Sequence, residues 1–283
     1  MIKSCLLFER ILELKHPPSA IRTSAICLYI RSMNRYFLEV SYKGKGWAGF
    51  QIQQNAPTIQ YEIEKALATF FRQTISLTGS SRTDSGVHAL QNYFHFDFEG
   101  VINPASIYNL NAILPGSIVV KNLVQVSATA HSRFDASSRE YKYFIYQQKD
   151  PFLEEIAFYY PYKLDIELLE RAAEALKQYR NFASFSKRGT QVKTFECSIQ
   201  RSEWKRENDC LVYNVIANRF LRGMVRGLVA TMLQVGRGKL SMEEFHNVIE
   251  SKDTAEADFA VPGHGLFLVS VNYPSGYFIE AKK

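Results

Sequence analysis

Hydrophobic and polar residues follow two different periods along the first half of the chain, and these periods predict its strands and helices. Residues 36–42 alternate between apolar and polar positions, as a strand with one buried face does. Residues 58–72 instead repeat apolar side chains every three or four positions, which indicates one buried face of a helix. Residues 93–98 alternate again. The same patterns predict a helix near 104–114 and a strand near 118–126.

The second half repeats the order strand, helix, strand, strand. The elements expected there are a strand at 139–146, a helix at 165–179, and strands at 196–204 and 211–217. After these come a basic helix at 219–235, a helix opened by a capping box at residues 241–244, and a last strand at 266–271. The chain therefore predicts an α+β fold of two related α/β modules, residues 33–137 and 138–283, with mainly antiparallel sheets.

The first 32 residues do not share these patterns. They hold short apolar runs and a break at Pro17 and Pro18, and no run reaches the roughly 18 apolar residues that a membrane span requires. No small-residue cleavage site follows a clear apolar core, so the segment does not resemble a secretory signal. We expect residues 1–32 to be a loose extension, or the product of an upstream start, outside the fold.

Composition and charge narrow the class of partner. The 283 residues are 46% hydrophobic and 22% charged, which is typical of a soluble globular protein. The formal net charge of +6 favours a polyanionic partner, and the basic stretch 219–239 contains no acidic residue. The four cysteines form no Cys-x-x-Cys pair and the six histidines no His-x-x-x-His pair. We therefore expect a reducing compartment and no zinc site.

Residues 44–49 match the Gly-x-Gly-x-x-Gly pattern of dinucleotide-binding loops. In such loops a helix opens at the last glycine, whereas residues 50–57 separate this pattern from the expected helix. The spacing argues against a nicotinamide-dependent oxidoreductase, and no other motif indicates a cofactor.

A polar loop at residues 79–89 carries the clearest candidate chemistry. Gly79 and Gly86 let the backbone bend tightly, and Asp84 lies at the middle of the loop with Arg82 two positions before it. A carboxylate held in this way beside a cation is a candidate nucleophile or general base. The alternative is an Asx-turn, in which Asp84 only hydrogen-bonds its own loop.

The same loop carries a family resemblance. Residues 82–89, Arg-Thr-Asp-Ser-Gly-Val-His-Ala, are similar to the Arg-Thr-Asp-x-Gly-Val-His-Ala signature of the TruA family of tRNA pseudouridine synthases. The match spans about residues 34–274, with a departure at Lys43, where family members usually have Asp. Further segments that agree with the family in the same order are residues 49–53, 111–115, 133–136, 139–143 and 224–226.

The resemblance implies a reaction and a role for several residues. The reaction isomerises uridine to pseudouridine, and Asp84 is its nucleophile, attacking either the sugar or the base. Arg226 pairs with Asp84, or alternatively contacts a phosphate. Arg82 assists extrusion of the target nucleotide or holds its flanking phosphate. Tyr141 stacks on the base and is also a candidate for removing the proton from carbon 5.

The resemblance also implies where the substrate binds. Leu266 or Leu268 would form an apolar wall of the base pocket, and Arg219 and Arg222 would hold the RNA backbone. Because these residues come from both modules, we expect the active site in a cleft between them. The family implies action on uridines 38, 39 and 40 of the tRNA anticodon stem-loop by a homodimer. We expect this homodimer in the cytoplasm, in line with the cysteine pattern, and the reaction requires no cofactor or metal. The alternative is an RNA-binding module without chemistry, against which the intact residues 82–84 argue.

Overall fold

The computed structural model of the protein describes residues 33–187, 189 and 192–278. The expected N-terminal extension, residues 1–32, lies outside these ranges. In the described part, nine strands form one sheet, and five α-helices and three short 3-10 helices accompany it. None of these helices is long and apolar enough to cross a membrane.

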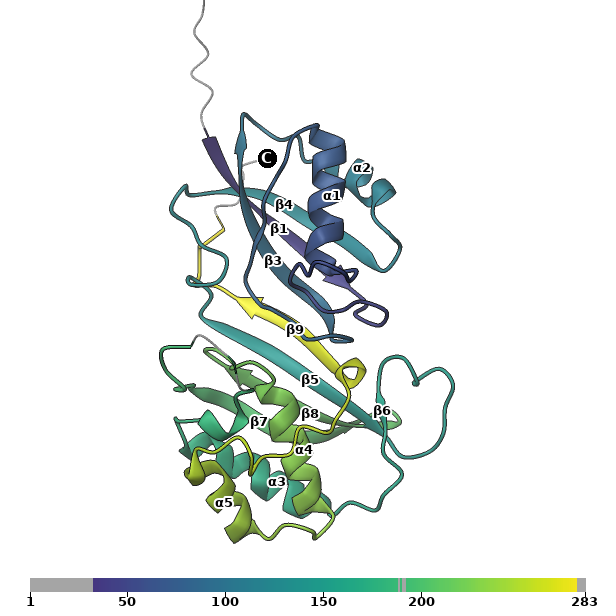
Figure 1. Ribbon diagram of the computed structural model, residues 1–283, viewed down its shortest axis with the longest axis vertical. Helices are drawn as coiled ribbons and strands as arrows, with labels where there is room; N and C mark the ends of the chain where they lie inside the picture. The colour runs from purple at the N-terminus through teal and green to yellow at the C-terminus, as the bar shows by residue number, and fades with distance from the viewer. Residues whose placement is uncertain (1–32, 188, 190–191, 279–283) are drawn as a thin grey trace, which may run out of the picture. The chain divides into compact units, whose positions relative to one another are not determined.

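Seven strands form the main path of the sheet, in the spatial order β4-β1-β3-β9-β5-β8-β7 (Figure 1). In chain order they are β1 (Met33–Tyr42), β3 (His88–Glu99), β4 (Ile118–Val126), β5 (Ser138–Tyr146), β7 (Ile199–Glu207), β8 (Cys210–Ala217) and β9 (Leu266–Asn272). Two-residue strands β2 (Thr78–Gly79) and β6 (Phe158–Tyr159) pair with β3 and β5. Neighbouring strands are antiparallel except for the β3–β9 and β5–β6 pairs.

Strand β9 joins the two halves of the chain. It pairs in parallel with β3, where His88 faces Phe267, and antiparallel with β5, where Tyr141 faces Leu268. The mixed α/β character and the mainly antiparallel pairing are confirmed. Where separate sheets were expected, however, the strands form one continuous sheet. The relatedness of two modules, 33–137 and 138–283, stays a prediction.

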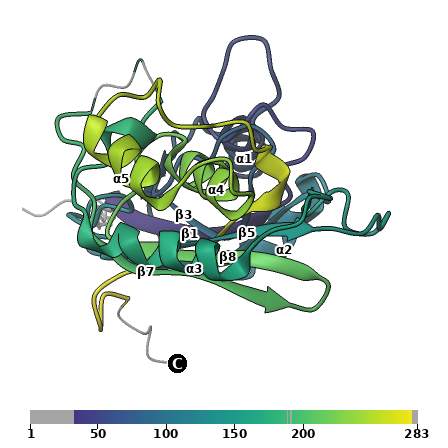
Figure 2. The ribbon, with the colours of Figure 1, turned by 90° about the horizontal axis from the view of Figure 1, so that it is seen from below.

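Each helix buries one apolar face, except for α4 (Met224–Gly236), which is buried on nearly all sides. They are α1 (Ile59–Phe71), α2 (Ser106–Ile113), α3 (Ile166–Ala175), α4 (Met224–Gly236) and α5 (Met242–Ser251). Figure 2 shows α1, α4 and α5 over the same face of the sheet. Eleven of the residues of α4 are buried, so this helix forms the centre of the C-terminal half rather than an exposed basic surface.

The predicted basic helix 219–235 was wrong at its start. Gly223 has φ +74°, a left-handed conformation that interrupts helical geometry, and α4 begins only at Met224. Arg219 and Arg222 therefore lie in the turn before the helix. The capping box was predicted correctly, because the Ser241 hydroxyl accepts from the Glu244 amide while the Glu244 carboxylate accepts from the Ser241 amide.

Candidate active site

The loop that carries Asp84 is fixed by hydrogen bonds on both sides. The Thr83 carbonyl accepts from the Phe50 amide at 3.0 Å, and the Asp84 carbonyl accepts from the Val87 amide at 3.2 Å. The Thr83 hydroxyl is 2.9 Å from the hydroxyl of the buried Tyr42. Burial raises the pKa of Tyr42 to about 12, so this phenol stays neutral at physiological pH. The Asp84 backbone is thus held in a single place.

Two glycines outside the loop allow it to pack closely. A Cβ atom on Gly44 would lie 2.0 Å from the Val87 carbonyl oxygen, and one on Gly263 would lie 2.2 Å from the Ser85 carbonyl oxygen. Any side chain at either position would therefore displace the loop. As the sequence predicted, residues 44–49 do not open a helix, since α1 begins at Ile59.

His88 links the end of this loop to two other segments. Its Nδ1 accepts from the Gly44 amide at 3.1 Å, so its Nε2 carries the proton and donates to the carbonyls of Glu155 and His264, each at 3.1 Å. The ring stacks on Phe267 with centroids 4.5 Å apart. Burial lowers the pKa of His88, which keeps the imidazole neutral. Sequence reasoning missed this residue, although its signature position between loop and strand was a signal.

Asp84 and Arg226 come together from positions 142 residues apart. The Arg226 Nη1 lies 3.4 Å from the Asp84 Oδ2, and the Arg226 Nε donates to the Val261 carbonyl at 2.8 Å. The side chains of Arg226 and Asp84 are 17% and 25% exposed. The ion pair is longer than the about 2.7–2.9 Å of a charge-assisted hydrogen bond. Arg226 is therefore anchored by the backbone, while the carboxylate stays accessible.

Tyr141 is buried and lies near enough to Asp84 for that carboxylate to affect its pKa. Its ring meets that of Phe220 edge-on, with centroids 5.1 Å apart. Burial, with added effects of the neighbouring Tyr42 and Asp84, raises the pKa of Tyr141. Tyr143, two residues on, is fully buried and donates from its hydroxyl to the Pro262 carbonyl at 2.8 Å, so it serves packing.

The two leucine candidates lie on β9 beside these tyrosines. Leu268 pairs with Tyr141 across the sheet and Leu266 pairs with Tyr143. Because paired residues share a face of the sheet, both leucines lie on the same face as the tyrosines. Both are buried.

The remaining predicted residues are cationic and more open. Arg82 and Arg222 are exposed and Arg219 is half-buried. None of the three forms an ion pair within residues 33–187, 189 and 192–278. A surface hollow of about 510 Å³ adjoins the Asp84 loop through Ser85 and Gly86, but Asp84 itself does not line it. The cleft expected between modules therefore stays a prediction.

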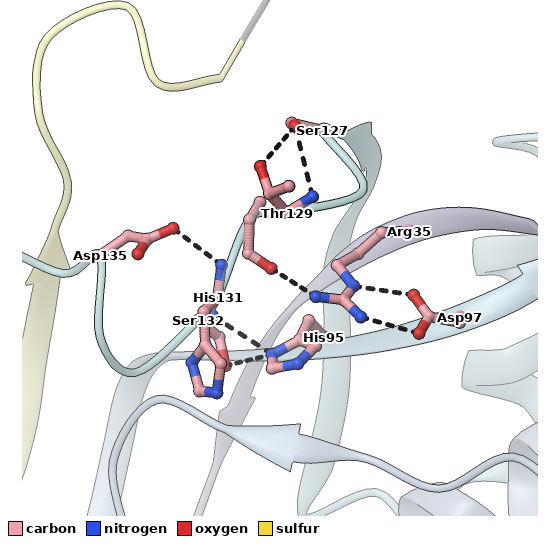
Figure 3. Close-up of polar contacts among 9 residues, drawn as sticks. Arg35, His95, Asp97, Ser127, Thr129, His131, Ser132 and Asp135 are labelled. Carbon is pink, nitrogen blue, oxygen red and sulfur yellow. Dashed lines mark hydrogen bonds and ion pairs between the residues drawn. The ribbon is translucent and has the colours of Figure 1, made fainter.

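His95 lies in a separate polar cluster, away from Asp84 in the fold (Figure 3). Its Nδ1 accepts from the Ser132 amide at 3.2 Å, and the Ser132 hydroxyl is 2.9 Å away. Nearby, Arg35 holds Asp97 through two bonds of 2.7 and 2.8 Å. In the described part of the chain, no group of three or more His, Cys, Asp or Glu side chains could hold a metal ion.

Comparison with known proteins identifies the family. A family model described as tRNA pseudouridine synthase matches residues 172–274. The chain is 47% identical to tRNA pseudouridine synthase A of Parabacteroides distasonis over 248 residues, which cover 87% of this chain and 98% of that protein. It is 43% identical to the Bacteroides thetaiotaomicron protein of that name, over 89% of this chain and 95% of the relative. The Staphylococcus aureus protein of the same name is 36% identical, over 84% of this chain and 91% of that protein. The chain belongs to the tRNA pseudouridine synthase A family.

Proposed function

We propose that the protein converts uridine to pseudouridine at positions 38, 39 and 40 of the tRNA anticodon stem-loop, with Asp84 as nucleophile on a flipped-out base. The observation that carries this proposal is the convergence of Asp84, Arg226 and Tyr141 in a chain of this family. An Asx-turn alone would not require a cation from 142 residues away at 3.4 Å.

The reaction rearranges bonds without adding or removing atoms. The bond between C1′ of the ribose and N1 of the base breaks, and a bond between C1′ and C5 forms. C5 loses a proton and N1 gains one. No electrons are exchanged with another molecule, so the reaction requires a nucleophile, a proton acceptor and a pocket that holds the detached base. Asp84 supplies the nucleophile, at the sugar or at the base.

Arg226 would keep the nucleophile charged. Enclosing a base over Asp84 removes water from the carboxylate, which disfavours its ionised form. The Arg226 guanidinium opposes that effect, and its bond to the Val261 carbonyl holds it in place. The roles implied by the resemblance are therefore compatible with the geometry.

Tyr141 would serve as a ring rather than as a base. Its raised pKa keeps the phenol protonated at physiological pH, so the group that it offers is an apolar face next to Asp84. A base leaving the helical stack loses a few kcal/mol of stacking, which such a ring recovers in part. This favours stacking over proton removal among the two roles expected for Tyr141.

The remaining parts of the proposal concern RNA binding and assembly. Arg82 would act on the target nucleotide or its phosphate, and Arg219 and Arg222 on the backbone. From kinship with the family we also propose a homodimer that works in the cytoplasm. Light scattering on the purified protein tests the dimer, and a monomer at assay concentration would refute it.

One experiment tests the activity. The protein is incubated with unmodified tRNA in the absence of any cofactor, and pseudouridine is then mapped along the tRNA. We expect product at positions 38, 39 and 40. Binding without product would favour an RNA-binding module, and product elsewhere would reject the assigned positions.

A further inference from the structure

Arg133 lies in a tight turn that is anchored to the sheet. The His131 amide donates to the Asp135 carboxylate at 2.8 Å, and the Arg133 amide donates to the His131 Nδ1 at 3.1 Å. Figure 3 shows how neighbouring contacts attach this segment to β1 and β3, through Arg35 and His95. Arg133 is exposed, yet its backbone is fixed.

Arg139 connects this turn to two other segments that carry arginines. Its side chain is only 8% exposed and has no carboxylate partner among the residues described. It donates instead to four backbone carbonyls, those of Arg133 at 2.6 Å, Asn218 at 2.9 Å, Ala136 at 3.0 Å and Ser80 at 3.5 Å. Buried charges need such compensation. The result is that three separate segments meet at one guanidinium.

Each of these segments presents an arginine at or near the bonded carbonyl. The Arg133 carbonyl itself accepts from Arg139. Arg219 directly follows Asn218, and Arg82 lies two residues after Ser80. The three are close enough that partial desolvation of the Arg133 guanidinium, together with the charges of Arg82 and Arg219, lowers the pKa of Arg133. We call Arg82, Arg133 and Arg219 the arginine cluster.

No acidic side chain neutralises the arginine cluster in the part of the chain that the structure describes. Asp84, the nearest acid in sequence to Arg82, is paired with Arg226. Asp135, the nearest to Arg133, accepts from the Tyr277 hydroxyl at 2.6 Å and from the His131 amide. Like charges brought together without counter-ions repel, so the arrangement is stabilised when an anion binds.

The chemistry of the cluster fits a phosphate group. Guanidinium forks bind phosphate oxygens in pairs of parallel hydrogen bonds, and arginine is weakly hydrated, so little is lost when water leaves. Next to the cluster, Phe134 is 74% exposed, with the Arg133 guanidinium carbon 5.8 Å from its ring centre. Cations beside an exposed aromatic ring are the combination that binds single-stranded nucleic acid.

We propose that the arginine cluster is a binding site for phosphates of the RNA backbone, and that Arg139 is the positioning residue that holds it together. This rests on the proposed function, since the tRNA is its source of phosphate. It adds Arg133 and Arg139 to the residues expected from the sequence.

The test compares Arg133→Gln with Arg206→Gln as a matched control. Arg206→Gln removes the same charge as Arg133→Gln. Arg206 is exposed on β7, and none of the interactions found for the described residues involves its side chain. The dissociation constant for unmodified tRNA is measured from 0.05 to 0.3 M salt. Losing one phosphate contact makes the slope of log K against log salt shallower by about 0.9, which weakens binding about eightfold at 0.1 M salt. Extrapolated to 1 M salt, the difference disappears.

For Arg133→Gln we expect the shallower salt slope together with an unchanged single-turnover rate at saturating tRNA. For the control Arg206→Gln we expect a smaller change in the salt slope. Equal slopes for the two variants would overturn the proposal. Binding is measured apart from turnover, so the result is separable from the proposed function: if the wild-type protein binds tRNA but makes no pseudouridine, the proposed function fails while the slopes still decide the arginine cluster.

Arg139→Lys tests the positioning role. Lysine keeps the charge, but its single ammonium cannot reach four carbonyls. We expect a salt slope shallower by at least one unit although every arginine of the cluster is present. A lower melting temperature with an unchanged slope, or a variant that does not fold, would assign Arg139 to stability alone and reject positioning.

Discussion

Replacing Arg226 by methionine should slow the chemical step far more than it weakens tRNA binding. Methionine keeps an unbranched apolar stem but is shorter and uncharged, so Asp84 loses the cation that lies 3.4 Å away. The neighbouring Val261 carbonyl also loses its 2.8 Å donor. If the carboxylate attacks the substrate, the loss falls on the reactive form of the enzyme.

The distance and exposure set the size of the effect. Two unit charges at 3.4 Å attract by about 5 kcal/mol at an effective dielectric constant of 20 and by about 1 kcal/mol in water. Because the two side chains are 17% and 25% exposed, we expect an intermediate value of about 2–4 kcal/mol. At about 1.4 kcal/mol for each factor of ten, the rate falls by roughly 30- to 1,000-fold.

Single-turnover kinetics at saturating enzyme separates the chemical step from binding. Arg222→Met is the matched control, because Arg222 is exposed in the turn just before α4. This control should raise the dissociation constant and leave the saturated rate nearly unchanged. If Arg226→Met behaves in the same way, Arg226 is a phosphate contact and its pairing with Asp84 has no catalytic role.

Three further predictions concern the loop and the sheet beneath it. Asp84→Asn should bind tRNA but form no pseudouridine, and appreciable turnover would remove Asp84 as the nucleophile. In Gly263→Ala the new Cβ atom would lie 2.2 Å from the Ser85 carbonyl oxygen, so the loop must move and turnover should fall about a hundredfold. In the control Gly116→Ala the new Cβ atom has no neighbour within 4 Å, so turnover should not change. Equal activities of the two variants would contradict the packing argument. Burial and the nearby charges lower the pKa of His95 to about 4, and since the unfolded chain binds the extra proton, stability should be lost as pH falls from about 6.5 towards 4. The expected loss between pH 7 and 5 is about 1–2 kcal/mol in urea unfolding, and a His95→Asn variant with the same pH dependence would refute it.

Local periodicity predicted most elements, because alternation and helical spacing reflect which side of an element is buried. The strand expected at 118–126 is β4 without change, and the capping box opens α5. Charge was a poorer guide to backbone structure. The run of arginines suggested a helix from 219, but the left-handed Gly223 delays it to Met224.

Long-range pairing had no local signal. The pattern of residues 266–271 indicates a strand but not its neighbours, and β9 pairs with β3 and β5, which lie far earlier in the chain. A period of two identifies a strand face and leaves its partners open. For this reason the sequence predicted a separate sheet for each half of the chain, whereas the strands form one continuous sheet.

The candidate site divides in the same way. Asp84 and Arg226 were suggested by motifs, and the structure brings them together. Gly44, His88 and Arg139 act through backbone groups of distant segments, which no spacing reveals. A signal existed for Arg139, since it shares the alternating face of the buried Tyr141 and Tyr143. An arginine on such a face must find polar partners inside the protein.

The central place of β9 has a consequence for the order in which the protein is made. Before residues 266–272 are synthesised, β3 and β5 are unpaired edges of two half-sheets, since β9 provides the strand pairing between them among the described residues. We expect nascent chains stopped before residue 266 to be protease-sensitive along both edges and unable to bind tRNA productively, and protected edges in such chains would contradict this. Addition of β9 covers both edges at once and joins the half of the sheet that follows the Asp84 loop to the half that precedes Arg226 in the chain. We therefore expect synthesis of β9 to complete the sheet, because an incomplete chain already carries Asp84 and Arg226 but lacks the strand that joins their two halves.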